Sequence, residues 1–200
     1  MEKMKLFGKW SEEGIEVKDI GLRNYINLQP VLIPRSGGRH AKKQFHKSKM
    51  NIVERLMNKL QVPGHHGKKH ILTSGRAVGK TLIHYKIVKE TFERIEQQTK
   101  KNPIEIFVRA IENSALREEI TQYQVGGMIL RRAVTTSPQR RVDLALSNIV
   151  QSAYRKSFGK KETIVDALTV EIVAASNNDA SKSEAIKEKE RLEREAEGSR

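Results

Sequence analysis

The segment 74–81 carries the residue types of a phosphate-binding loop, because Gly-Lys-Thr follows a short apolar pair. Loops of that class wrap nucleotide phosphates with successive backbone N–H groups, and their motif places four residues between its two glycines. Here only three residues separate Gly75 from Gly79, and no strand-like run ends in an aspartate that could hold magnesium. The spacing argues against nucleotide hydrolysis. It favours a glycine-rich turn that approaches RNA phosphates, with Arg76 and Lys80 as its cations.

A second group with chemical potential is the histidine cluster of His65, His66 and His70. The neighbouring Lys68 and Lys69 would repel a metal ion held by imidazole ligands. The chain has no cysteine, which excludes thiolate zinc sites, disulfides and a cysteine nucleophile. Ser, His and Asp occur without a local signature that groups them. We therefore expect no catalytic site, metal or cofactor, and expect these histidines to stack on bases or bond phosphates.

Charge is the most informative property of the chain. The net charge is +14 and the pI is about 10. Between positions 32 and 80 there are twelve Lys or Arg residues and one acid, Glu54. Such a polycation repels itself and is compensated by a polyanion whose counterions it releases. The front of the molecule is therefore predicted to be a nucleic-acid surface, and the low aromatic content of 5% favours recognition of a structured RNA by backbone and shape.

The predicted RNA contacts are cations of the front segment, of loops and of helix starts. Arg140 and Arg141 stand out because cations in the first turn of a helix oppose its dipole. An acid in the fold or an RNA phosphate must offset that cost. The full predicted set is Arg35, Arg39, His40, Lys42, Lys43, Lys47, Lys49, Lys68, Lys69, Arg76, Lys80, Arg140, Arg141 and Lys160.

The elements that position these residues follow from periodicity and caps. Residues 1–47 show no sustained period and are predicted to be an extended basic arm, ordered by contact with a partner. Helical spacing begins after Ser48 and continues over residues 80–100, from Pro103, from Pro138 to about 158, over 163–175 and over 183–196. Asn102-Pro103 and Ser137-Pro138 are cap-then-proline signals. The last helix is almost all charge, and its weak apolar stripe indicates either docking on a partner or a solvated tail.

Between these helices the period changes from helix to strand. Gly126-Gly127 can take the positive φ angles of a two-residue turn, which pairs Val125 with Met128 and Tyr123 with Leu130. The prediction is a mainly α fold: a bundle of about six helices with one protruding β-hairpin near 119–136. The divisions are an arm at 1–47, a bundle at 48–176 and a charged tail at 177–200. No apolar run is long enough for a membrane helix.

Several ordered stretches resemble the universal small-subunit ribosomal protein seven family. They are residues 102–113, the Val125-Gly126-Gly127 turn and residues 137–146. The archaeal and eukaryotic branch is the more similar one, through 38–41, 51–56 and the ending 185–200. The resemblance covers the chain from Leu6 onward.

The resemblance implies a non-enzymatic role in the cytoplasmic ribosome. Its implied partners are small-subunit ribosomal RNA, through the 3′ major (head) domain whose assembly it starts, exit-site tRNA, messenger RNA and neighbouring small-subunit proteins. It places the hairpin tip near the exit-site tRNA and messenger RNA. Gln122-Tyr123-Gln124 stand where bacterial members often carry arginines, so the returning strand would supply the cations. The implied tip set is Val125, Gly126, Gly127, Met128, Arg131 and Arg132. An RNA-stimulated nucleotide hydrolase and a helical DNA-binding protein are the alternatives.

Overall fold

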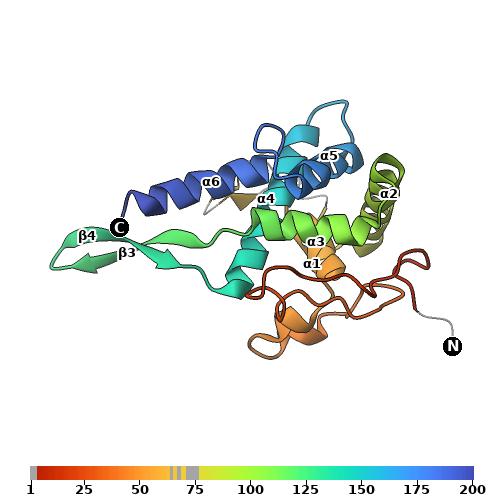
Figure 1. The fold of residues 1–200 in the computed structure, drawn as a ribbon, viewed down its shortest axis with the longest axis horizontal. Coiled ribbons are helices and arrows are strands. Elements are labelled where there is room, and N and C mark those ends of the chain that lie inside the picture. The colour runs from red at the N-terminus through yellow and green to blue at the C-terminus, as the bar shows by residue number, and fades with distance from the viewer. Residues whose placement is uncertain (1–3, 64, 67–68, 71–76) are drawn as a thin grey trace.

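The computed structural model describes residues 4–63, 65–66, 69–70 and 77–200. Its helices pack around one core, and a β-hairpin projects from the bundle (Figure 1). This confirms the mainly α fold with a single long hairpin. The helices of the described part are α1 (Ile52–Leu60), α2 (Thr81–Thr99), α3 (Pro103–Ser114), α4 (Pro138–Ser157), α5 (Ile164–Ser176) and α6 (Glu184–Glu197), with short 3-10 turns η1 (Arg39–Ala41) and η2 (His46–Lys49). Two short antiparallel strands, β1 (His65–His66) and β2 (Lys69–His70), lie where only a loop was expected.

Most helix starts follow from local side-chain caps. Asn102 accepts a hydrogen bond from the Ile104 N–H, and Thr163 and Ser183 cap α5 and α6 in the same way. Asn51 caps α1, so this helix begins three residues later than the expected start after Ser48. The predicted cap at Ser137 makes no side-chain bond, although Pro138 does occupy the first turn of α4.

The hairpin consists of β3 (Glu118–Val125) and β4 (Met128–Thr135). Its register pairs Val125 with Met128 and Tyr123 with Leu130, as predicted. Gly126 and Gly127 have φ of 56° and 88°, the left-handed values that a two-residue turn requires. Eight residues per strand extend the tip roughly 27 Å at about 3.4 Å per residue.

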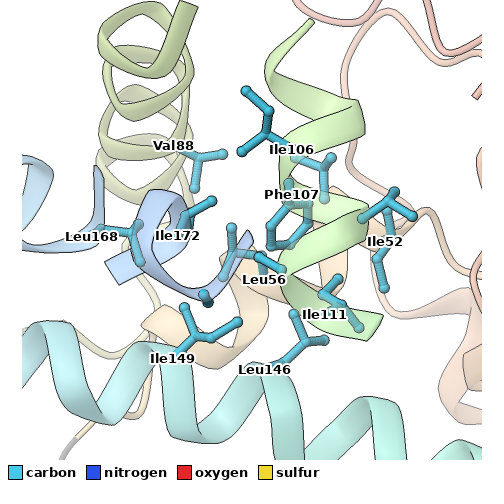
Figure 2. Packing of buried hydrophobic residues seen from close by; sticks show 14 of the residues in the cluster. Ile52, Leu56, Val88, Ile106, Phe107, Ile111, Leu146, Ile149, Leu168 and Ile172 are labelled. Atoms are coloured by element: carbon cyan, nitrogen blue, oxygen red, sulfur yellow. The ribbon is translucent and has the colours of Figure 1, made fainter. Parts of the chain in front are cut away.

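The core lies where α5 packs against α2, α3 and α4. Figure 2 shows labelled side chains of α1, α2, α3, α4 and α5 converging there. Phe107 of α3 and Ile172 of α5 are fully buried between Leu56, Val88 and Ile149 of the surrounding helices. Burial of such side chains contributes roughly 1.5–3 kcal/mol each, so this packing is the main stabilising contribution.

The front segment is part of this core, which corrects the expectation that a partner orders it. Trp10 Nε1 donates to Glu96 Oε2 at 3.0 Å, and the Trp10 ring meets Phe92 edge-on. The segment runs along one side of the bundle in Figure 1. The buried apolar residues of the front segment have no periodic spacing, and each is buried separately instead of as part of one apolar helix face. The buried ones are Leu6, Phe7, Trp10, Leu22 and Ile26. The boundaries at 47 and 176 stay predictions.

The last helix also packs on the chain itself, so neither the expected docking on a partner nor a solvated tail describes it. Ala185, Ile186 and Ala196 are buried, and α6 lies along α4 and β3. Arg200 donates to both Glu118 carboxylate oxygens at 2.7 and 2.8 Å, which anchors the end of the chain to the hairpin base. None of the helices in the described ranges is long and apolar enough to cross a membrane.

Candidate nucleic-acid interface

The cations of the front segment gather on the turns around η1 and η2. Gly37 and Gly38 take φ of 65° and 78°, which folds residues 35–49 back toward α1. We call this group the arm surface. Its exposed or partly exposed members are Arg35, Arg39, His40, Lys42, Lys43 and Lys49.

The segment that forms the arm surface, residues 35–49, contains no acidic residue. Glu54, the one acid between positions 32 and 80, is buried, and its Oε1 accepts from the Ser36 N–H and hydroxyl at 2.7 and 2.6 Å. The carboxylate therefore holds the arm to α1 from inside. Desolvation, and then the charges of Lys49 and Lys43, lower the pKa of His46 below its ordinary value. The part of this shift that Lys49 and Lys43 cause reflects a positive potential, which a phosphate backbone would also meet.

Behind the arm surface, one carboxylate joins the arm to two helices. Asp143 of α4 accepts from Lys47 Nζ at 2.7 Å and from Arg55 Nη2 at 3.0 Å. The Arg55 side chain is 1% exposed, and its Nη1 donates to the Tyr25 carbonyl at 2.8 Å. Burial raises the pKa of Asp143, but Lys47 and Arg55 lower it further, so the net pKa lies below its ordinary value. Lys47 is thus a structural cation as well as a predicted RNA contact.

Replacing this carboxylate tests the arrangement. We expect Asp143→Asn to lower the free energy of unfolding at pH 7 by about 3 kcal/mol, because it leaves the buried Arg55 charge poorly compensated. The pKa of Asp143 is depressed in the folded state. The stabilisation that its ion pairs contribute is therefore complete above the unfolded pKa of about 3.9, and it is lost as pH falls through the folded pKa. The deficit should therefore shrink between pH 7 and pH 3 in urea unfolding.

A matched control is Asp166→Asn, whose ion pair with Arg94 is 40–46% exposed. It should cost less than about 1 kcal/mol. An Asp143→Asn deficit that is the same at both pH values would contradict the assignment.

The two arginines at the start of α4 differ in their surroundings. Arg140 donates from Nε and Nη2 to both carboxylate oxygens of Glu119, at 2.6 and 2.8 Å, and its side chain is 55% exposed. Arg141 is 11% exposed and donates to Asp19 at 2.7 Å and to the Leu116 carbonyl at 2.9 Å. Acids in the fold therefore offset the dipole cost. Arg140 keeps a solvent-facing edge for a phosphate, whereas Arg141 is committed to holding the arm against the hairpin base.

The remaining predicted contacts lie apart from the arm surface. Lys80 precedes α2 and Lys160 follows α4, and both are exposed. The residues around Lys80 border the carboxyl end of α4, whereas Arg140 begins that helix. At about 1.5 Å per residue the two ends of α4 are about 30 Å apart. The predicted Lys68 and Arg76, and the Lys69 side chain, lie outside the described residues, as does most of the glycine-rich turn.

The hairpin tip presents a mixed surface. Val125, Met128 and Ile129 are 52%, 67% and 69% exposed. Arg131 and Arg132 follow on the returning strand and are also exposed, on opposite faces of the ribbon. The hairpin carries this group away from the bundle, unlike the other predicted site residues that the structure describes (Figure 1).

Three residues beside the arm surface were not among the predicted contacts. Phe45 is 67% exposed in the turn before η2, Lys59 lies on α1, and Gln139 lies in the first turn of α4. Their proximity depends on contacts between distant segments, so spacing along the chain could not reveal it. In the part of the chain that the structure describes, no group of three or more His, Asp or Glu side chains is placed to hold a metal ion.

A helical bundle with one projecting hairpin and a polycationic side is the architecture of a protein that lies on a polyanion. Comparison with known proteins specifies the family: residues 22–200 match the model of ribosomal protein S7p/S5e. The chain belongs to this family.

Curated relatives extend the similarity over nearly the whole chain. It is 52% identical over 198 residues to the small ribosomal subunit protein uS7 of Nanoarchaeum equitans, covering 99% of this chain and 100% of that protein. The uS7 proteins of Methanothrix thermoacetophila and Archaeoglobus fulgidus are 42% and 43% identical, over 98% and 100% of this chain and 100% and 96% of theirs.

Proposed function

We propose that the chain is a structural, non-enzymatic component of the small subunit of cytoplasmic ribosomes, bound to the 3′ major (head) domain of its RNA. The observation that carries this proposal is the arm surface: the one acid between positions 32 and 80, Glu54, is buried and bonds Ser36. Family membership and the uS7 relatives support it. Because many cations contribute, the protein can help nucleate assembly of the head by holding several RNA segments together.

Three separate cationic sites support contact with more than one RNA segment. The arm surface adjoins the start of α4, Lys80 and Lys160 lie toward its other end, and the hairpin extends further. In this proposal Arg131 and Arg132 bring the hairpin to exit-site tRNA and messenger RNA, and neighbouring small-subunit proteins are further partners. Lys68, Lys69 and Arg76 remain proposed RNA contacts of the glycine-rich turn.

The test is binding of the purified chain to a head-domain RNA fragment, compared with duplex DNA and an unrelated RNA of equal length, across a salt series. We expect selective binding of the head fragment that persists at moderate salt, with a log–log slope that falls by about one unit for each phosphate-contacting cation removed. Equal, steeply salt-dependent binding to all three would reject the proposal. A preference for duplex DNA would favour a DNA-binding protein instead.

Changes at the hairpin turn should separate RNA binding from translation. A Cβ added at Gly127 meets no heavy atom within 4 Å, so the cost of Gly127→Val comes from its φ of 88° alone, about 1–2 kcal/mol confined to the tip. We expect unchanged affinity for the head fragment and reduced translation by reconstituted subunits. Gly127→Asn is the control, since asparagine tolerates this φ better. A loss of RNA affinity in the valine variant as large as its loss of translation would contradict a separate role for the tip.

A further inference from the structure

A pocket of about 550 Å³ lies between the arm and the first turns of α4. Phe45 of the arm, Lys59 of α1, and Gln139 and Asp143 of α4 are among the residues that line it. The volume is within the range of small-ligand sites and is large enough for one nucleotide. The pocket directly adjoins the arm surface and Arg140, so RNA bound to those cations would lie next to its opening.

Phe45 gives the pocket an aromatic wall. Its side chain is 67% exposed, and its backbone has φ of 62°, a left-handed conformation that bulky residues rarely adopt. The turn thus holds a large apolar ring in solvent among cations, at the position that precedes η2. Exposed rings in a basic setting bind unpaired bases by stacking, which is tolerant of sequence because every base has a π face.

Lys59 gives the pocket a cation that forms no ion pair with any described residue. No carboxylate within the described ranges lies within ion-pair distance of Lys59. The carboxylate of Asp143 is already paired with Lys47 and Arg55. Burial lowers the pKa of the Lys59 ammonium; the Asp143 charge opposes this shift, and the charges of Lys47 and Arg55 add to it, so the net pKa lies below its ordinary value. Three cations around one carboxylate leave a local excess of positive charge that a bound anion would balance.

The start of α4 supplies hydrogen-bonding groups. The side-chain oxygen of Gln139 is buried and has no hydrogen-bond partner among the described residues. Ser137 makes no side-chain cap, so the first N–H groups of this 20-residue helix lack the acceptor that a cap would supply. A base amino group could donate to the Gln139 oxygen, and a phosphate could accept from the helix start.

We propose that this pocket binds one unpaired nucleotide of the RNA. Its base stacks on Phe45, its exocyclic amino group donates to the Gln139 side-chain oxygen, and its phosphate lies between Lys59 and the start of α4. The inference rests on the proposed RNA-binding function and adds a base-level contact to recognition that otherwise depends on backbone and shape. An aromatic wall beside a cation distinguishes a nucleotide from a bare phosphate.

The experiment compares three variants of the full chain in binding to the head-domain fragment across a salt series. Phe45→Leu keeps an apolar side chain and removes the stacking ring; we expect about tenfold weaker binding with an unchanged salt slope. Lys59→Met should reduce the slope by about one unit. Phe158→Leu is the matched control, because Phe158 is 42% exposed after the opposite end of α4. It should bind like the natural chain.

A direct readout is a Phe45→Trp variant, whose added fluorescence, measured against the natural chain with its single Trp10, should be quenched when the fragment binds. The pocket would be overturned if Phe45→Leu bound the fragment as tightly as the natural chain, or if Phe158→Leu lost as much affinity as Phe45→Leu. It would also be overturned if Phe45→Leu weakened binding to a protein partner and not to RNA. Each of these results would leave the proposed function standing. Failure of the natural chain to bind the fragment would overturn both.

Discussion

Removal of residues 1–47 is expected to abolish cooperative folding. The deletion takes away Trp10, Leu22 and three other buried apolar side chains, together with the Trp10 bond to Glu96. Loss of one large buried side chain costs about 2–5 kcal/mol, and a domain of this size is stable by only about 5–15 kcal/mol. Circular dichroism should show reduced helix content, and urea should give no sharp transition.

The control separates the structural and binding roles of the front segment. Lys42→Gln with Lys43→Gln removes two exposed cations and leaves every core contact in place. That chain should fold normally and bind RNA with a salt slope lower by about two units. A truncated chain with native helix content and a cooperative transition would show that the front segment is an independent arm after all.

Glu171→Ala is expected to cost about 3–5 kcal/mol, because this fully buried carboxylate joins three elements. Its Oε1 accepts from the Ser183 hydroxyl at 2.8 Å and the Ala185 N–H at 3.0 Å. Its Oε2 accepts from the Ser152 hydroxyl at 2.6 Å and from Lys156 Nζ at 2.7 Å. Alanine leaves the Ser152 and Ser183 hydroxyls and the Ala185 N–H without this acceptor, whereas Lys156 Nζ keeps its bond to the Lys182 carbonyl at 2.9 Å. Hydrogen exchange should show α6 opening before α3 or α5.

The matched control for this prediction lies on α6 itself. Glu190→Ala removes a carboxylate whose contact with Arg194 is long, at 3.9 Å, and largely exposed. We expect its cost to be below about 0.5 kcal/mol. If the two alanine variants were equally stable, or if α6 kept its protection in Glu171→Ala, the carboxylate would not be what holds the last helix.

Features set by neighbouring residues could be predicted from the sequence. The hairpin register follows from Gly126-Gly127, since a two-residue turn fixes every pair along the ribbon. The start of α3 follows from Asn102-Pro103 for the same reason. These signals act within four residues, so no tertiary contact competes with them.

Features set by distant residues could not be predicted. The front segment has no period, so the burial of Leu6 and Leu22 depends on grooves that other helices create. Arg141 was assigned to RNA by its charge, but its partner Asp19 is 122 residues away. Charge density predicted a polyanion-binding surface, while the division between structural and exposed cations needed the fold.

Directed hydroxyl-radical probing tests the central claim most directly, because the chain has no cysteine and one engineered thiol is therefore unique. An iron chelate attached at Lys43→Cys on the arm surface and, separately, at Val125→Cys on the hairpin tip would cleave nearby RNA in reconstituted small subunits. We predict cleavage in the 3′ major domain from position 43, and near the exit-site tRNA and messenger RNA from position 125. Cleavage outside the head domain from position 43, or none from either position, would contradict the account.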